Sequence, residues 1–335
     1  MSHFPVTHSN LSASHLAIFL QQVYAIGEPL GCSILKSGIN DTYLVTAPAG
    51  RYIFRVYSLA WRTKEEIGEE IKLLLLLKDN DLSVSYPLAD AAGSYIKLLH
   101  APEGDRYGVL FSYAEGEKLP QYDQDTHYSV GELMARIHTA THNMELQRPT
   151  YNETNLLLQP LIEISNFLPD GTAPEMAFMA TAQQYLLTEL RNANVAELRH
   201  GIVHMDIWFD NLNINSGKQI TIFDFDFCGN GWLCLDIAYY ILQLHSVEKD
   251  ETICLQKVNS FLSGYESITA ISAEEKRLLP ALGVAMYFFY LGIQCSRFHN
   301  FSNVFLNPAY LRRFITVLVK GYFEKQKLGI NALQR

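Results

Sequence analysis

Two acid-rich stretches of this chain carry residues whose types and spacing could do chemistry. The first is HMDIWFDN (204–211), which holds two acids and an amide within eight residues. The second is ITIFDFDF (220–227), where Asp224 and Asp226 stand in an apolar run. A solvated loop accounts for the first stretch taken alone. Carboxylates inside an apolar run need a ligand or a partner, so the two stretches together predict a functional site.

The acids and the amide of these stretches form an all-oxygen set of potential ligands. Asp206 and Asn211 lie five residues apart and can converge from one loop. Side chains alternate along a strand, so we expect Asp224 and Asp226 to point to the same side. Carboxylate and amide oxygens suit hard divalent cations such as Mg²⁺. The sequence therefore predicts a Mg²⁺ held by Asn211 and Asp224, with Asp226 available for a second ion.

A carboxylate base beside such a metal site is typical of enzymes that transfer phosphoryl groups. The transition state of this reaction is loose, so the protein contributes mainly positioning and charge neutralisation. We expect Asp206 to orient the attacking hydroxyl and to accept its proton. Because that hydroxyl gains little charge until late in the reaction, an aspartate of ordinary pKa suffices. Asp206 is therefore expected to be ionised throughout the neutral range.

Composition and charge limit the classes of protein to which this chain can belong. Its 335 residues favour two packed lobes, and 48% hydrophobic with 18% charged residues is typical of a globular enzyme. A net charge of -9 argues against a nucleic-acid partner. The five cysteines form no C-x-x-C pair, which is typical of reduced thiols. We find no leader and no apolar run approaching ~18–20 residues, so we expect a soluble cytoplasmic protein without a membrane partner.

The elements that must position these residues fall into two groups along the chain. Apolar residues at helical spacing predict a helix at 9–27. Two β-rich hairpins follow, at 32–58 and 95–113, with a charged-faced helix at 63–81 between them. These elements predict a small sheet-based lobe at 1–112, and turns rather than crossover helices predict an antiparallel sheet.

The remainder, 113–335, is mostly helical in pattern. Its exception is a short hairpin, in which LNIN (212–215) and QITIFDFDF (219–227) flank a turn. The acid-rich stretches lie at the two ends of this hairpin. The predicted fold class is therefore α+β, with the catalytic hairpin inside the helical lobe.

The first acid-rich stretch resembles the catalytic loop H-G-D-x-H-x-x-N of the aminoglycoside phosphotransferase, choline kinase and homoserine kinase superfamily, a branch of the protein-kinase-like fold. The spacing from Asp206 to Asn211 is the same, and His204 opens both motifs. Met205 replaces the family glycine and Trp208 replaces the second histidine, so the roles of those two family residues do not carry over.

Further motifs extend the resemblance along the chain. FDFD (223–226) is similar to the family metal motif I-D-[WF]-[DEY]. Asp236, in the triplet DIA, stands for the family acid that braces the catalytic loop, with His204 as further structural support. The stretch LMARIHTATH (133–142) resembles a packing helix. The resemblance implies a two-lobe kinase-like fold and an ATP- and Mg²⁺-dependent transfer to the hydroxyl of a small molecule.

The small lobe resembles the family less closely. GINDTYLV followed by YIFRVY is similar to the first strand pair of homoserine kinase-like members. This likeness implies that Arg55 takes the place of the nucleotide-binding lysine, where its charge is kept and its forked geometry differs. Glu70 is the expected helix partner of Arg55, and a shift of register would substitute Glu69 or Glu66.

The resemblance also assigns the nucleotide base and the acceptor. The chain crosses between the lobes at FSYAEGE (111–117), which implies adenine contacts from Phe111, Ser112, Tyr113 and Ala114. The acceptor would lie in a cleft of the helical lobe. Its candidate lining residues are Trp208, Asp210, Tyr239, Tyr240, Tyr290, Gln294, Arg297 and Phe298. Acids and aromatics suit an ammonium group, whereas Arg297 suits a carboxylate, so aminoglycoside, amino alcohol such as choline, and homoserine-like acceptors all stay open.

Two other functions compete with a small-molecule kinase. A protein Ser/Thr kinase is disfavoured because HRD, DFG and APE signatures are absent and the ten residues from Asp226 to Asp236 leave no room for an activation segment. A nucleotide-binding pseudokinase that acts as an interaction module is disfavoured by the joint presence of Asp206, Asn211 and Asp224. The chain is expected to act as a monomer or a homodimer.

Overall fold

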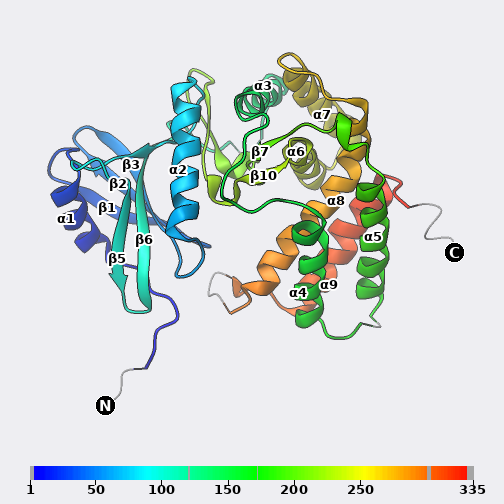
Figure 1. The fold of residues 1–335 in the computed structure, drawn as a ribbon, viewed down its shortest axis with the longest axis horizontal. Coiled ribbons are helices and arrows are strands. Elements are labelled where there is room, and N and C mark those ends of the chain that lie inside the picture. The colour runs from blue at the N-terminus through cyan, green and yellow to red at the C-terminus, as the bar shows by residue number, and fades with distance from the viewer. Residues whose placement is uncertain (1–3, 120, 172, 300–302, 330–335) are drawn as a thin grey trace. The chain divides into compact units, whose positions relative to one another are not determined.

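The computed structural model describes residues 4–119, 121–171, 173–299 and 303–329, and Figure 1 shows its ribbon. The chain divides into two compact units, each described by itself below. The first unit comprises Met1–Glu117 and Asn213–Phe223, and the second comprises Lys118–Leu212 and Asp224–Arg335.

The first unit is built on an antiparallel sheet. Its strands are β1 (Gly31–Ser37), β2 (Asp41–Ala47), β3 (Gly50–Val56), β4 (Pro87–Leu88), β5 (Ile96–Ala101) and β6 (Gly104–Ser112). They lie in the order β1-β2-β3-β6-β4, and β5 also pairs with β6. Gly50 and Gly104 adopt positive φ values of 142° and 139° at the turns before β3 and β6, where a side chain would be strained. The antiparallel sheet of the predicted α+β fold is confirmed.

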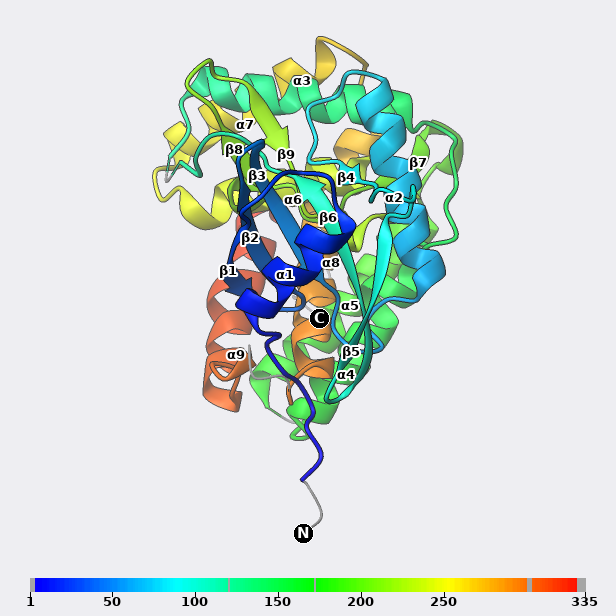
Figure 2. The same cartoon turned by 90° about the vertical axis from the view of Figure 1, so that its left-hand side faces the viewer.

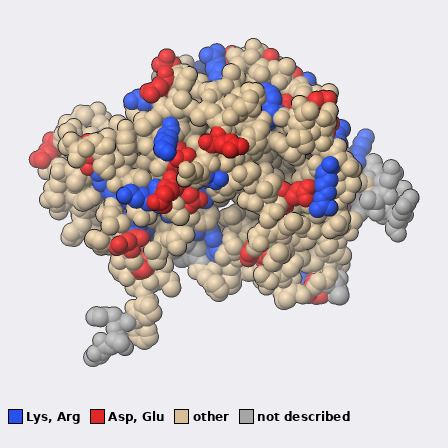
Figure 3. Space-filling model, in the orientation of Figure 1, with Lys and Arg blue, Asp and Glu red and all other residues tan. Residues whose placement is uncertain are grey.

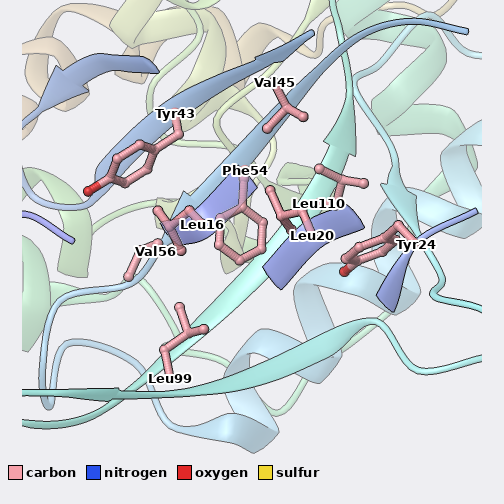
Figure 4. Close-up of a cluster of buried hydrophobic side chains, with 9 residues drawn as sticks. All are labelled: Leu16, Leu20, Tyr24, Tyr43, Val45, Phe54, Val56, Leu99 and Leu110. Atoms are coloured by element: carbon pink, nitrogen blue, oxygen red, sulfur yellow. The ribbon is translucent and has the colours of Figure 1, made fainter. Parts of the chain in front are cut away.

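One helix packs on the open face of this sheet. Helix α1 (Ala13–Val23) begins after Ser12, whose hydroxyl accepts the N–H of His15. Figure 2 shows α1 lying over the strands, and Figure 4 shows the apolar side chains between them. That buried cluster consists of Leu16, Leu20, Tyr24, Tyr43, Val45, Phe54, Val56, Leu99 and Leu110. The helix that precedes the first strand is therefore part of the core.

The other helix of the first unit is α2 (Lys64–Asp79), which begins at a capping box. The N–H of Glu66 donates to the Thr63 hydroxyl at 3.1 Å, and the N–H of Thr63 donates to the Glu66 carboxylate at 2.9 Å. This start sets the helix register, which buries Glu70 completely.

The hairpin of β8 (Leu212–Ile214) and β9 (Ile220–Ile222) belongs almost entirely to the first unit. Ile222 bridges to Val84 and Ile214 bridges to Glu117. The predicted lobes, 1–112 and 113–335, placed this hairpin in the helical part. The compact units divide the chain differently because backbone bonds tie the hairpin to the sheet-based unit.

The second unit is mainly helical. Its helices are α3 (Gln124–Ala140), α4 (Gln159–Phe167), α5 (Pro174–Arg191), α6 (Cys234–Val247), α7 (Glu251–Glu266), α8 (Ala273–Ser296), α9 (Pro308–Phe314) and α10 (Gly321–Lys325). A two-stranded antiparallel ladder joins β7 (His200–Val203) to β10 (Gly229–Trp232). The two acid-rich stretches leave this ladder, one after β7 and the other before β10.

Helix α8 contains a long apolar run, contrary to the expectation from the sequence. It has 24 residues and a window of mean hydropathy 1.6, so in the described part of the chain it is the one helix long and apolar enough to cross a membrane. Most of that window is buried within the second unit, where α8 packs against α4 and α6. The prediction of no such run was wrong, and burial in the core accounts for the apolar composition.

Charged side chains of both signs are interspersed over the face drawn in Figure 3. Several charged residues of the second unit pair locally. Arg277 lies 2.8 Å from Glu274 and 2.5 Å from Glu189, and Arg312 lies 3.0 Å from Glu175. Exposed pairs of this kind contribute little to stability, so buried charges matter more.

Asp41 and Arg106 form a buried ion pair in the first unit. Both side chains are fully buried, and Nη2 of Arg106 lies 2.8 Å from Oδ2 of Asp41. The guanidinium also donates to the carbonyl oxygens of Tyr57 and Ser9, each at 2.8 Å. Asn10 donates to the other Asp41 oxygen at 3.1 Å. This network joins β2 and β6 to the segment before α1.

We predict that Arg106→Met lowers the free energy of unfolding by about 3–5 kcal/mol, because it leaves the Asp41 carboxylate buried without its cation. Urea denaturation followed by circular dichroism measures this change. Arg51→Met is the matched control, since the Arg51–Glu115 pair is exposed. Equal effects of the two substitutions would contradict a stabilising role for the buried network.

Candidate active site

The stretch that follows β7 is held by a buried carboxylate at the start of α6. Asp236 accepts the backbone N–H of His204 at 2.8 Å and that of Met205 at 2.7 Å. His138 from α3 contacts the same carboxylate through Nε2 at 3.1 Å. These bonds lie within the second unit and fix the backbone that leads into Asp206.

The backbone of this loop takes a left-handed conformation at Met205, where φ is 69°. Such a conformation costs a non-glycine residue roughly 1–2 kcal/mol, which explains why the resembled motif has glycine here. The Met205 side chain is fully buried. Beside it, the His204 ring lies 4.3 Å from that of Phe225, and its Nδ1 accepts the Asp206 N–H at 3.1 Å.

Three side chains donate hydrogen bonds to the Asp206 carboxylate. The hydroxyls of Tyr239 and Tyr290 donate to Oδ1 at 2.7 and 2.8 Å. The amide of Asn211 donates to Oδ2 at 2.7 Å and to the Asp206 backbone oxygen at 3.0 Å. Sequence reasoning included both tyrosines among residues of an acceptor cleft and missed their bonds to Asp206. The position of Tyr239, one helical turn after Asp236, was the available signal.

Burial raises the pKa of the Asp206 carboxyl to about 7. The hydrogen bond from Tyr239 lowers this pKa, the nearby charge of Asp224 raises it, and the bonds from Tyr290 and Asn211 lower it. The prediction of an ordinary pKa was therefore wrong. A loop position suggested full contact with water, whereas Asp206 is only partly exposed and its carboxylate is contacted by Tyr239, Tyr290 and Asn211.

The second acid-rich stretch does not form the strand that the alternation argument required. Strand β9 ends at Ile222, Asp224 is left-handed with φ 67° and ψ 62°, and a short 3-10 turn spans Phe225–Phe227. The prediction that Asp224 and Asp226 share a strand face was wrong. Asp226 is buried, and its backbone oxygen accepts from the Arg148 guanidinium.

The donors available for a divalent cation are few. No group of three His, Cys, Asp or Glu side chains that could hold a metal occurs among the described residues. Asn211 is buried and uses its amide nitrogen on Asp206, so its oxygen is the atom that it offers to a cation. Asp224 lies close enough to Asp206 to raise its pKa. One amide and one carboxylate oxygen fit Mg²⁺, which keeps several water or phosphate ligands.

A separate charged pair lies in the first unit. Nη1 of Arg55 is 3.0 Å from Oε1 of Glu70, and both side chains are buried. Glu66 is used in the capping box and Glu69 contacts Lys72 at 2.5 Å, so Glu70 is the partner of Arg55. The Phe111 ring lies 5.2 Å from the Arg55 guanidinium.

The segment predicted to contact adenine is partly engaged already. The N–H of Ser112 donates to the Tyr86 oxygen at 2.8 Å, and the Ala114 oxygen accepts from Asn213 at 2.6 Å. Tyr113 and Ala114 follow the end of β6, where the ladder with β3 stops at the Tyr52–Ser112 pair.

The residues predicted to line the cleft for the phosphoryl acceptor do not all lie near Asp206. The Trp208 ring packs against its neighbour Phe209 at 4.5 Å, and Asp210 pairs with Lys118 at 2.9 Å. Tyr240 is buried and its hydroxyl contacts His127 at 2.9 Å. Neighbouring helical residues point about 100° apart. Tyr239 therefore reaches Asp206, and Tyr240 does not.

Two more candidates for the acceptor cleft, Gln294 and Arg297, lie at the end of α8. Gln294 stands four residues after Tyr290, on the same helix face. Its Oε1 is buried without a hydrogen-bond partner in the described structure. Arg297 follows at the C-cap, where its carbonyl oxygen accepts from Asn303 at 2.9 Å.

The sequence is similar to a family of phosphotransferases and to proteins of several bacteria. The family described as "Phosphotransferase enzyme family" matches residues 32–269. An uncharacterised protein of Synechocystis is 30% identical over 92% of this chain and 85% of its own length. A homoserine kinase of Bradyrhizobium diazoefficiens is 27% identical over 84% of both proteins.

Solved structures with the same fold confirm the kinase-like architecture. A microcompartment-associated aminopropanol kinase superimposes with a TM-score of 0.76 at 21% identity, covering 94% of this chain and 99% of that one. An amicoumacin kinase in complex with AMP-PNP, Ca²⁺ and Ami gives 0.75 at 18% identity, covering 94% of each chain.

We predict that Asp236→Asn lowers the free energy of unfolding by about 1.5–3 kcal/mol, because an amide replaces a charged acceptor of two buried N–H groups. Urea denaturation measures the loss. Glu153→Gln is the control, since Glu153 pairs with Arg191 at the surface. If both substitutions change stability equally, Asp236 does not brace the loop.

Proposed function

This chain belongs to the phosphotransferase enzyme family, as a small-molecule kinase, and from that premise we propose that it transfers the γ-phosphoryl group of ATP to the hydroxyl of a small amine-bearing alcohol. The observation that carries this proposal is the joint placement of Asp206, Asn211 and Asp224 in the second unit. The Asn211 amide donates a hydrogen bond to the Asp206 carboxylate at 2.7 Å, and the charge of Asp224 raises the pKa of Asp206.

In the proposed reaction, Asp206 accepts the proton of the substrate hydroxyl. The hydroxyl oxygen forms a bond to the γ-phosphorus, and the bond from that phosphorus to the leaving oxygen of ADP breaks. A carboxyl whose pKa is about 7 is matched to proton transfer at neutral pH. Asp206 therefore orients the nucleophile before the bond forms and collects its proton as it forms.

Asn211 and Asp224 are the proposed Mg²⁺ ligands. The cation, when bound, supplies neutralisation of the phosphate charge. Asn211 offers an amide oxygen and Asp224 a carboxylate, which is the ligand chemistry that Mg²⁺ prefers. Asp226 is buried, and the proposal does not require it.

Residues of the first unit are proposed to bind the nucleotide. Arg55 would contact phosphate oxygens, and Glu70 holds its guanidinium at 3.0 Å. The Tyr57 hydroxyl donates to the second oxygen of Glu70 at 3.0 Å, which fixes the carboxylate in turn. The backbone of Tyr113 and the N–H of Ala114 would pair with adenine.

A homoserine-like hydroxy amino acid is the acceptor that the named relatives favour, since one of them is a homoserine kinase. The aminopropanol kinase of the same fold makes an amino alcohol the next candidate. In this chain, the unpartnered Oε1 of Gln294 suits an ammonium donor, and Arg297 suits a carboxylate.

The experiment that tests this function measures ADP release from ATP and Mg²⁺ in the presence of L-homoserine, aminopropanol, choline and an aminoglycoside. We expect at least one alcohol to raise ADP release well above the rate with water alone, with a phosphate ester detected by ³¹P NMR. Stimulation by a protein substrate and by none of the alcohols would overturn the proposal in favour of a protein kinase.

We predict that Asp206→Asn lowers kcat by about a hundredfold or more, because the amide cannot accept the hydroxyl proton. The KM for ATP should change little, since Asp206 is not a proposed metal ligand. Steady-state kinetics measures both constants. Asp210→Asn is the control on the same loop, and the assignment of the base fails if Asp210→Asn inactivates the enzyme while Asp206→Asn does not.

We predict that Asp224→Ala abolishes Mg²⁺-dependent ATP turnover, because it removes the single charged metal ligand that the proposal assigns. Circular dichroism should show the fold intact, as Asp224 is only partly buried. Isothermal titration of Mg²⁺ with AMP-PNP gives a readout independent of turnover. Unchanged cation binding in this variant would place the metal elsewhere.

A further inference from the structure

Two phenols share one oxygen of the Asp206 carboxylate. Tyr239 on α6 donates to Oδ1 at 2.7 Å, and Tyr290 on α8 donates to the same atom at 2.8 Å. The two rings are stacked, with centroids 5.3 Å apart and planes at 26°. Two helices that are not consecutive in the chain, α6 and α8, thus supply a pair of donors to one atom.

The acceptor capacity of the carboxylate limits what a substrate can contact. An ionised carboxylate has about four lone-pair sites, two on each oxygen. On Asp206, the two phenols fill Oδ1, and the Asn211 amide takes one site of Oδ2. A single lone pair, on Oδ2, is therefore left to accept a hydrogen bond from a substrate hydroxyl.

We propose that Tyr239 and Tyr290 are positioning residues that saturate Oδ1 of Asp206 and so direct the substrate hydroxyl to Oδ2. This inference rests on the proposed function, in which Asp206 accepts the hydroxyl proton. It adds which oxygen of the base reacts and which side chains decide that choice. The reacting oxygen is the one that also contacts Asn211, a proposed metal ligand.

Packing keeps the two phenols in place. Tyr290 makes edge contacts with the rings of Phe227 at 5.9 Å and Phe289 at 5.2 Å. Tyr239 is almost fully buried. Burial, and then the charge of Asp206, hold the pKa of both phenols well above the ordinary value, so both stay protonated donors. Rotation of the carboxylate would break both bonds at once.

Tyr290 also has a second acceptor, the carbonyl oxygen of Met205 at 2.8 Å. A phenol has one proton, so it donates to Met205 or to Asp206 at a given moment. While Asp206 is ionised, the charged oxygen is the stronger acceptor. Once the substrate proton reaches Oδ2, the charge is lost and the Tyr290 proton can turn to Met205. The phenols keep their own protons throughout, and the transferred proton ends on Oδ2.

The test compares Tyr239→Phe, Tyr290→Phe and the double variant with Tyr287→Phe. Tyr287 is a matched control because it lies on α8, is buried, and bonds through its hydroxyl to Ser246 at 2.8 Å, away from Asp206. ADP release is measured with water and with L-homoserine as acceptors, together with the KM for ATP and the midpoint of thermal unfolding.

We expect each Asp206-contacting phenol to contribute about tenfold to kcat, the scale of one hydrogen bond to a charged group. The double variant should be at least as slow as either single variant. The KM for ATP should stay within about twofold, and Tyr287→Phe should keep the wild-type kcat. A loss of kcat with unchanged ATP binding is a result that a structural role alone would not give.

Three results would overturn the inference. The first is a kcat for the double variant within about twofold of wild type while Asp206→Asn is impaired; the proposed function then stands and the positioning role falls. The second is an equal loss of kcat in Tyr287→Phe. The third is a loss that follows the unfolding midpoint. If Asp206→Asn itself retains full activity, the proposed function fails, which is a separate outcome.

Discussion

The arrangement of the site depends on one buried carboxylate. Asp236 is 1% exposed and accepts two successive backbone N–H groups, those of His204 and Met205. Because both N–H groups point to the same carboxylate, the backbone turns sharply, and Met205 takes a left-handed conformation at this turn. The next residue, Asp206, is thereby turned toward α6 and α8. Because Asp236 opens α6, the element that fixes the loop also carries Tyr239.

Opposing electrostatic effects act on the pKa of the Asp206 carboxyl. Burial and the neighbouring Asp224 favour the neutral acid, while donors from Tyr239, Tyr290 and Asn211 favour the anion. The balance leaves a base that is neither fully ionised nor fully neutral near pH 7 in the protein without a cation. A cation at Asn211 and Asp224 would offset the Asp224 charge and favour the anion.

The sequence predicted the local elements well and the tertiary contacts poorly. Hairpin turns predicted the antiparallel sheet, because turn residues act over a short range. The brace by Asp236 was implied by the resemblance of its DIA triplet to a family motif. The strand through Asp224 failed because alternation cannot detect a left-handed residue. The bonds from Tyr239 and Tyr290 could not be predicted, because they depend on how α6 and α8 pack. The burial of Asp206, and so its pKa, depends on the same packing.

The buried Asp41–Arg106 pair makes residues outside the family match part of the fold. The match to the phosphotransferase family covers residues 32–269, but Ser9 and Asn10 complete the bonds of that pair, and α1 covers the sheet. At the other end, α8 lies beyond residue 269 and supplies Tyr290. A gene fragment cut at the limits of the family match would expose one face of the sheet and remove a hydrogen-bond donor from Asp206. The segment that matches the family is therefore shorter than the segment that the fold requires.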